Sequence, residues 1–349
     1  MLFLTTANYI IIGLWGLLSL VNAHPLDYAK PKLSDYEFFR EPISKQISID
    51  SIFPYRISTP LFTDYAFKSR FIVLPEGGRI TYVNEDIFDF PVGTIFIKTF
   101  YYPSDFRVPE ANWNVIETRL LVHTPEGWTG YPYIWNNEQT DAYLEIAGGR
   151  QNVSWIDKKG ISQSVHYRIP NFNMCKDCHV IDNVFQPIGP KPRILNCENT
   201  YEGTSQNQLE KMIEWNMVEN MPPLESIPIT AEWDNNHYSL NDRARAYLDM
   251  NCAHCHNSKG PANTSGLFLE YHEKDRKKLG VLKPPIAAGR GSGGLSFNIV
   301  PGKPNESIFI FRMESIDPGI LMPESGRKMV HKEGVALIRN WIESMGENP

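Results

Sequence analysis

This chain of 349 residues contains few cysteines, and it has fewer basic than acidic residues. Its five cysteines are too few for the disulfide-rich scaffold of a small secreted protein. Lysine and arginine number 34 against 40 acidic residues, which gives a formal net charge of −6. Because binding to a polyanion depends on clustered positive charge, nucleic acid is not expected as a partner. The hydrophobic content of 42% is that of a globular protein, and the length allows two domains.

The first 23 residues contain no charged side chain, and their apolar run ends in the small-residue stretch Val21–Ala23. This pattern predicts a signal peptide over residues 1–23, although the Lys or Arg that usually precedes such a run is missing. An uncleaved anchor is the alternative, because about 20 apolar residues can span a bilayer. Both interpretations place residues 24–349 outside the cytoplasm, and a membrane contact is expected only if the segment is retained.

Residues 24–168 are predicted to form a β-rich domain. Short segments rich in β-branched and aromatic residues, such as VGTIFIKTF (92–100) and VIETRLLVHT (115–124), are separated by turns that contain Gly or Pro. Seven such segments favour a β-sandwich-like fold. We find no catalytic constellation in this half, and its tryptophans are interpreted as core residues.

After residue 168 the pattern changes to helical periodicity interrupted by proline-rich loops. Apolar residues recur at helical spacing in 205–217, in 240–256 and in 331–345. The sequence therefore predicts a multidomain β + α protein, in which the β-sandwich-like domain is followed by a mainly helical region.

Four of the five cysteines stand in two CxxC pairs, each followed at once by a histidine. The six residues are Cys175, Cys178 and His179 in MCKDCHV, and Cys252, Cys255 and His256 in NCAHCHN. On a helix, residues i, i+3 and i+4 share a face, so each set aims two thiols and an imidazole at one place. Covalent heme c needs this arrangement, with two thioether bonds and a histidine on the iron. We expect two covalently attached hemes c, in a first heme-binding segment at 169–235 and a C-terminal cytochrome c domain at 236–349.

Zinc binding, dithiol chemistry and disulfide formation by the four cysteines fit the sequence less well than heme attachment. The pairs are 74 residues apart, far beyond the spacing of a zinc ribbon, and zinc would not explain the histidine after both pairs. A thioredoxin-like dithiol needs a βαβ pattern, which is absent, and disulfides of three-residue spacing would be strained.

The sixth ligand of the second iron is predicted to be Met322, in the proline-flanked stretch ILMPESG before the last helix. A methionine sulfur on such a loop would close the heme pocket and raise the reduction potential relative to bis-histidine ligation. Met313 and Met329 lie nearby in the sequence and are the alternative ligands. If Met322 is not a ligand, it is interpreted as a methionine that fills a gap in the core.

The sixth ligand of the first iron is harder to predict. Met221, which precedes two prolines, is the leading candidate, and Met217 is close to it in the sequence. A histidine from elsewhere, namely His123, His166 or His237, is an alternative. A further alternative is that no side chain binds at the sixth position of the first iron, which would allow a peroxide to reach the iron.

Several other residues carry weaker signals. His254, inside the second motif, points away from its own iron if the helix is regular, which favours a position at the surface or at the propionate edge. Arg290 and Arg312 are candidates for propionate contacts, and GRGSGG (289–294) is interpreted as a loop at the heme edge because it lacks the strand-to-helix context of a phosphate-binding loop. Cys197, the odd cysteine, is predicted to be a buried free thiol.

Long segments of the chain resemble an uncharacterised bacterial family of secreted or periplasmic diheme c-type cytochromes with an N-terminal β domain. The resemblance rests on TPLFTDYAFKSRFIVLP, DFPVGTIFIKTF, ETRLLVHTPEGWTGYPYIWN, QPIGPKPRILN, CAHCHNSKGPANTSGL and IVPGKPNESIFIFRMESIDPGILMPESGR. It extends from about residue 32 to residue 346. It implies two covalently bound hemes, with methionine ligation at Met322, and it implies no substrate.

These observations together predict a heme-binding electron carrier of the bacterial periplasm, with a dehydrogenase or another cytochrome as its redox partner. The acidic net charge favours a basic partner. A diheme peroxidase-like enzyme with an open site at the first heme is the alternative function. A third hypothesis is a binding module, in which residues 24–168 capture a saccharide or a protein and the hemes act as sensors.

Overall fold

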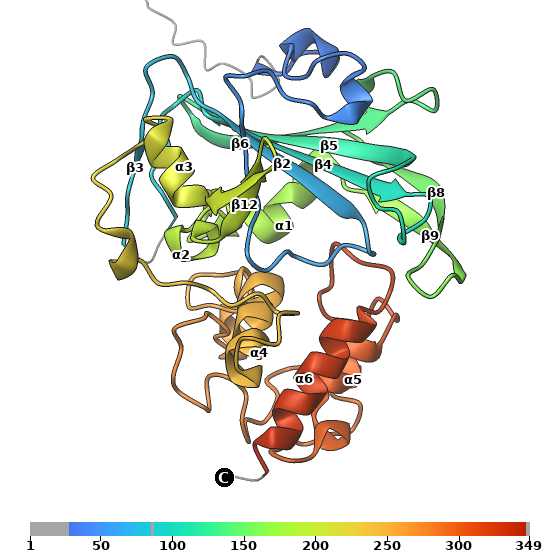
Figure 1. Cartoon of the computed structure of the whole chain (residues 1–349). Helices are drawn as coiled ribbons and strands as arrows, with labels where there is room; N and C mark the ends of the chain where they lie inside the picture. The colour runs from blue at the N-terminus through green and yellow to red at the C-terminus, as the bar shows by residue number, and fades with distance from the viewer. Residues whose placement is uncertain (1–27, 85–86, 347–349) are drawn as a thin grey trace, which may run out of the picture.

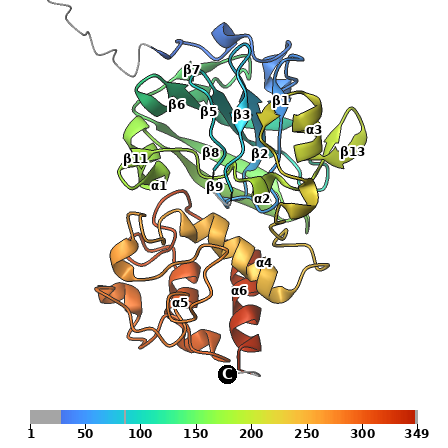
Figure 2. The same cartoon turned by 90° about the vertical axis from the view of Figure 1, so that its left-hand side faces the viewer.

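The computed structural model describes residues 28–84 and 87–346, so the predicted signal peptide at 1–23 lies outside the described residues. The chain is arranged as two stacked parts (Figures 1 and 2). A β-rich part contains residues up to about 235, and a smaller part contains the helices α4, α5 and α6.

Six antiparallel strands form the large sheet, in the order β1-β2-β4-β5-β6-β7. These strands are β1 (Phe53–Pro54), β2 (Phe67–Val73), β4 (Ile95–Pro103), β5 (Trp113–Thr124), β6 (Gly127–Trp135) and β7 (Ala142–Leu144). The remaining strands form two-stranded pairs. They are β8 (Gly149–Ile156) with β9 (Ser162–Ile169), β10 (Val180–Ile181) with β11 (Val184–Phe185), β12 (Glu198–Tyr201) with β13 (Thr204–Asn207), and β14 (Val218–Glu219) with β3 (Ile80–Thr81).

Six α-helices are found among the described residues, and the longest has 13 residues. They are α1 (Lys176–His179), α2 (Pro192–Leu195), α3 (Gln208–Glu214), α4 (Leu240–Leu248), α5 (Ile308–Glu314) and α6 (Lys332–Ser344). Within that part of the chain, no helix has the length and hydrophobicity needed to cross a membrane.

The predicted fold class, a β-sandwich-like domain followed by a mainly helical cytochrome c-type heme region, is wrong. Strands β10–β14 continue the β structure beyond residue 168, and residues 205–207 belong to β13 rather than to a helix. The helix predicted over residues 240–256 corresponds to α4, which ends after nine residues at Leu248. The chain between residues 258 and 306 runs mainly through turns and loops. Proline and glycine explain much of this, because KPP (283–285) and GRGSGG (289–294) interrupt any continuous helix there.

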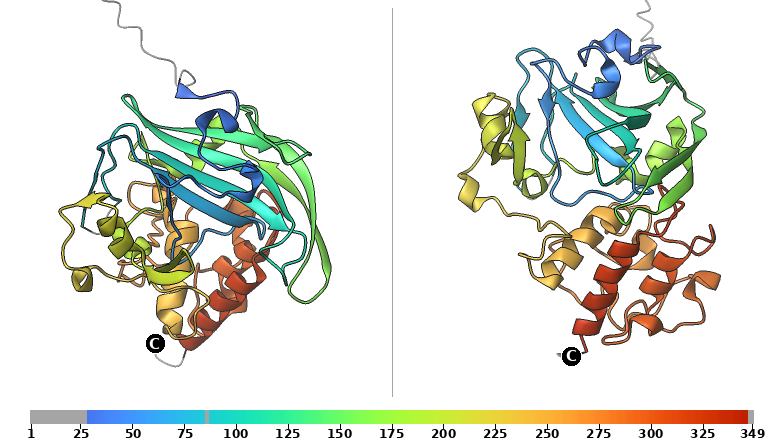
Figure 3. Two further views of the ribbon diagram at one scale, coloured as in Figure 1. Left: turned by 45° about the horizontal axis from the view of Figure 1, so that its top comes forward. Right: turned by 45° about the vertical axis from the view of Figure 1, so that its right-hand side comes forward.

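The β-rich part contains one large sheet and a β8–β9 ribbon, in place of the expected sandwich of two comparable sheets (Figure 3). Segment 28–52 covers one face of the sheet, where Phe39 packs on Phe71 at 5.1 Å between ring centroids. The opposite face carries Ile72 and Phe96, which share a core with residues 194–227. The predicted first heme-binding segment therefore packs on the sheet, whereas α4, α5 and α6 enclose a core of their own.

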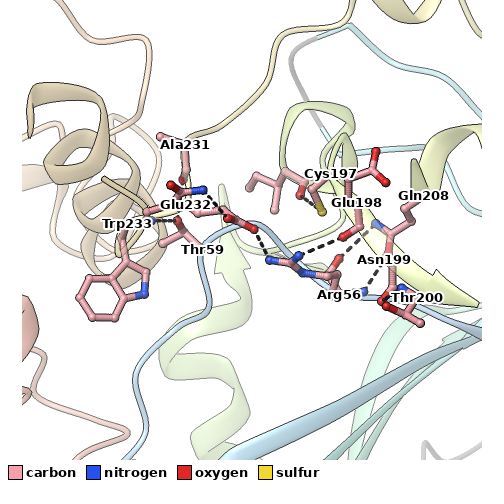
Figure 4. A network of polar contacts seen from close by, with 12 residues as sticks. Arg56, Thr59, Cys197, Glu198, Asn199, Thr200, Gln208, Ala231, Glu232 and Trp233 are labelled. Carbon is pink, nitrogen blue, oxygen red and sulfur yellow. Dashed lines mark hydrogen bonds and ion pairs between the residues drawn. The ribbon is translucent and has the colours of Figure 1, made fainter. Parts of the chain in front are cut away.

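Polar contacts attach the segment after residue 190 to the loop that joins β1 and β2 (Figure 4). Arg56 is ion-paired with Glu232 and donates to the Glu198 carbonyl at 2.9 Å. Thr59 donates to the Ala231 carbonyl at 2.7 Å. These bonds hold the connection between the two parts against the sheet.

Candidate functional site

The first CxxCH motif occupies a single helical turn that packs on the sheet. The 3-10 turn η4 (Phe172–Cys175) leads directly into α1, and the Asn171 side chain caps the turn by accepting the Met174 N–H at 2.9 Å. On β6, a Cβ added to Gly130 would lie 3.4 Å from the Cys175 sulfur. The strand therefore approaches the first thiol with its backbone, and a side chain larger than alanine at this position would press on it.

His179 is held by the hairpin that follows the first motif. Strands β10 and β11 bring Gln186 back to the helix, where the Gln186 carbonyl accepts a hydrogen bond from His179 Nδ1 at 2.8 Å. Phe185 stacks on the imidazole with centroids 5.3 Å apart. Burial lowers the pKa of His179 to about 4, so the ring is neutral, with its proton on Nδ1 and a lone pair on Nε2. This is the tautomer that a metal-ligating histidine needs.

The second motif follows a change of helix type. Helix α4 runs into the π-helix η6 (Asp249–Ala253), and the Asn257 side chain donates to the Ala253 carbonyl at 2.8 Å. The chain then returns so closely that a Cβ at Gly260 would lie 2.4 Å from the Cys255 carbonyl oxygen. Glycine is therefore required directly behind this motif.

His256 has the same tautomer as His179, through a different partner. Its Nδ1 lies 3.2 Å from the Ser265 hydroxyl. That hydroxyl donates its own proton to the Ala262 carbonyl at 2.7 Å, so its oxygen accepts from His256. Burial lowers the pKa of His256 to about 4, which leaves a neutral ring with a lone pair on Nε2.

The two motifs touch each other although they are 74 residues apart in the sequence. The Cys255 thiol lies 3.6 Å from the carbonyl oxygen of Asp177, inside the first motif. Behind it, the Asp182 N–H donates to the Lys259 carbonyl at 3.1 Å. The loop that contains Met322 also contacts the first motif, because the Ser325 hydroxyl donates a hydrogen bond to the Asp177 carboxylate at 3.1 Å.

A single cavity of about 750 Å³ is lined by all six motif residues. Its volume falls within the range of about 300–1,000 Å³ that is usual for pockets of small molecules and cofactors. Met322 also lines it, and the backbone of Met322 is held by Arg327, which donates to its carbonyl at 2.8 Å, and by Arg312, whose carbonyl accepts the Met322 N–H. Met313 lines the same cavity, whereas Met329 does not.

The cysteines are free thiols, and all five lie in the described part of the chain. Burial raises the pKa of Cys175 and Cys178, and it raises the pKa of Cys252 and Cys255 to about 12. The four motif thiols are therefore protonated at neutral pH, which does not favour thiolate chemistry or metal binding through sulfur.

A row of three cations crosses the sheet where it faces the cavity. Arg70 on β2, Lys98 on β4 and Arg119 on β5 are direct cross-strand partners, so their side chains point to one face. Arg119 is ion-paired with Glu117, but the structure gives Arg70 Nη2 no hydrogen-bond partner, and Arg70 is only 8% exposed. Burial, reinforced by Arg70 and Arg119, lowers the pKa of Lys98 well below its usual range.

Like charges directly opposite one another destabilise a sheet unless an anion compensates them. Each heme carries two propionate carboxylates, and this row offers more positive charge than Glu117 neutralises. The cavity therefore brings together side chains of the kinds that hold heme c. It offers four thiols, two histidines with a free Nε2, a methionine, and a cationic wall.

The other residues predicted as ligands of the first iron lie away from this cavity. Met221 and Met217 pack with the apolar core between the sheet and α3. His123 stacks on Trp128 and donates to the Phe90 carbonyl. His166 bonds to Asn152 at the surface, and His237 is exposed.

The weaker sequence signals have mixed outcomes. Arg312 lines the cavity, whereas Arg290 is paired with Asp317 at the surface, in the loop 289–294. Cys197 is partly buried, and its thiol points to the Ile194 carbonyl at 3.8 Å (Figure 4). Burial raises the pKa of Cys197 to about 11.

Sequence reasoning missed two features of the cavity. His254 was expected at the surface or the propionate edge, but it is only 6% exposed and lines the cavity. The cationic row was not anticipated at all. Its signal is basic residues inside largely apolar strands, as in FKSRFIV and IFIKTF, where charge is costly without a function.

Within residues 28–84 and 87–346, no three His, Cys, Asp or Glu side chains are grouped so that they could hold a metal ion by themselves. Comparison of the chain with protein-family models, with curated proteins and with solved structures found no match.

Proposed function

We propose that this protein is a diheme c-type cytochrome that carries single electrons between redox partners in the bacterial periplasm. The observation that carries the proposal is the meeting of two CxxCH motifs at one cavity, with the Nδ1 of both histidines already engaged. The Cys175/Cys178/His179 set would hold the first heme, and the Cys252/Cys255/His256 set would hold the second. Met322 is the proposed sixth ligand of the second iron.

When bound, each heme supplies an iron that takes one electron from a donor protein and passes it to an acceptor, as Fe(III) becomes Fe(II) and returns. The residues of the chain set the conditions for this. Hydrogen bonds from His179 and His256 fix the ring orientation and strengthen both imidazoles as donors. The cationic row of Arg70, Lys98 and Arg119 would balance propionate charge at the first heme, and Arg312 would do so near the second.

The two sites differ in ways that favour two different reduction potentials. His179 donates its Nδ1–H hydrogen bond to a backbone carbonyl. His256 donates its Nδ1–H hydrogen bond to a serine hydroxyl, which is a weaker acceptor. The first motif lies against the cationic sheet, and the second lies next to the Met322 loop. A pair of unequal potentials gives electron flow a direction, as a carrier between a dehydrogenase and another cytochrome needs.

The test is the visible spectrum of the matured protein, oxidised and reduced, with pyridine to count the hemes. Two hemes c per chain, both low-spin when oxidised, are expected. A chain without covalent heme would refute the proposal. One high-spin heme that binds peroxide or cyanide would replace it with the peroxidase-like alternative at the first site.

A further inference from the structure

His254 occupies an unusual place, between the two cysteines of the second motif. On a helical turn it lies about 160° around the axis from Cys252 and His256 and about 100° from Cys255, so it points away from the heme that those residues would hold. A side chain in this position would ordinarily be solvated. Here it is 6% exposed, and its Nδ1 has no partner in good hydrogen-bond geometry, although the Met250 backbone lies close enough to raise the pKa of the ring.

The buried imidazole lines the cavity that the first motif also lines. The neighbouring Cys255 thiol is 3.6 Å from the Asp177 carbonyl, between the two cysteines of the first motif. His254 therefore lines the same cavity as His179 and as the three basic residues of the sheet.

Two other cavity-lining side chains that could bind iron are already engaged. The Met174 sulfur accepts a hydrogen bond from Arg168 at 3.3 Å. His331 has partners at both nitrogens, because its Nδ1 lies 3.0 Å from the Tyr247 hydroxyl and its Nε2 lies 3.8 Å from the Glu333 carboxylate. An unpartnered nitrogen in a buried ring costs free energy unless a ligand satisfies it, and of the four histidines that line the cavity His254 is the one with a buried nitrogen in this state.

We propose that His254 is the sixth ligand of the first iron, so that the second CxxCH turn supplies a ligand to each of the two irons. This inference rests on the proposed function and assigns the ligand that the sequence left open. The first site would then be bis-histidine, and the second would be histidine–methionine. Because methionine raises the potential, the first heme becomes the low-potential centre and the second the high-potential centre.

The experiment compares His254→Ala and His254→Met with the unchanged protein, and His272→Ala serves as a matched control at an exposed histidine. The motif leaves its two inner positions open, so both variants keep the covalent attachment signal. Electron paramagnetic resonance and visible spectra of the oxidised protein are expected to show one of two hemes turning high-spin in His254→Ala. Added imidazole should restore its low-spin form.

His254→Met is the second variant, and it still tests the ligand role of residue 254 if the alanine variant yields no heme-loaded protein. It should remain low-spin, gain a second sulfur-to-iron band in the near infrared and raise the potential of the first heme. Two unchanged low-spin hemes with unchanged potentials in either variant would overturn the inference. A high-spin first heme in the unchanged protein would also overturn it.

The heme count separates this inference from the proposed function. Pyridine spectra that give fewer than two hemes c in the unchanged protein refute the diheme proposal and the inference with it. Two hemes c whose spectra do not respond to His254 refute the inference alone.

Discussion

Replacing Asp249 with asparagine is expected to destabilise the protein by about 3–5 kcal/mol, the usual loss when one partner of a buried ion pair is removed. The Asp249 carboxylate lies 2.8 Å from Arg193 and accepts the Tyr271 N–H at 2.9 Å. The side chains of the pair are 6% and 7% exposed. Asparagine can keep the bond from Tyr271, but it leaves the Arg193 guanidinium buried without a counter-charge. The pair joins α2 to the turn that begins the second motif, so its loss also loosens that motif.

The assay is the free energy of unfolding of the purified heme-loaded protein, from urea titrations followed by tryptophan fluorescence. The control is Glu214→Gln, which breaks the exposed pair with Lys211 and should cost less than about 1 kcal/mol. The double variant Arg193→Leu/Asp249→Leu removes both charges and should regain most of the loss. Equal losses for Asp249→Asn and Glu214→Gln, or a double variant no more stable than the single one, would refute the reasoning.

The same pair predicts a dependence on pH. Burial raises the pKa of Asp249, but attraction by Arg193 and Lys191 outweighs it, so the pKa in the folded protein lies below its usual value. The stabilisation is therefore complete above the unfolded-state pKa of about 3.9 and is lost as the pH falls through the folded-state pKa. Asp249→Asn should lack this acid-dependent increment. An identical acid dependence in both proteins would show that other groups control it.

Three further predictions concern the cavity. Met322→Ala should abolish the near-infrared sulfur-to-iron band and lower the potential of the second heme, and a retained band would exclude Met322 as ligand. Ser265→Ala removes the acceptor of the His256 Nδ1 proton, weakens the imidazole as a donor to Fe(III) and should raise the potential of the second heme. Exposed Ser258→Ala is its control, and a potentiometric titration with equal values for both variants would contradict the role of Ser265. Lys98→Met removes an amine that heme propionates would keep protonated despite its burial, so Fe(III) becomes easier to form, and an unshifted potential of the first heme would place Lys98 away from it.

Local patterns in the sequence were sufficient to predict several elements. The apolar stripe of 331–345 became α6, at Lys332–Ser344. The strand-like runs VGTIFIKTF and VIETRLLVHT became β4 and β5. Each of these signals comes from residues within a few positions of one another, and packing later reinforced the preference. The prediction of a mainly helical second half failed because the same periodicity occurs in short turns that proline and glycine interrupt.

The arrangement of the cavity could not be predicted, because it depends on contacts between distant segments. The row of Arg70, Lys98 and Arg119 exists only when the registers of β2, β4 and β5 are known. A single-residue slip would move each cation to the opposite face. The burial of His254 likewise follows from the contact between two motifs that lie 74 residues apart. Sequence spacing predicted that its side chain turns away from the heme that this motif would hold, and the fold places the side chain in the wall of the shared cavity.

The sheet is part of the cavity wall, so the β-rich part is more than a docking surface. Gly130 lies against Cys175, and the cationic row belongs to the face that packs on the first motif. An isolated fragment of residues 24–168 would expose this row and the apolar face beside it, which residues after 190 cover in the whole chain. Any ligand that such a fragment captured would therefore report on a surface that is buried in the intact protein. For that reason the function of the β-rich part is best tested through the potential of the first heme, which the charges of this sheet would control.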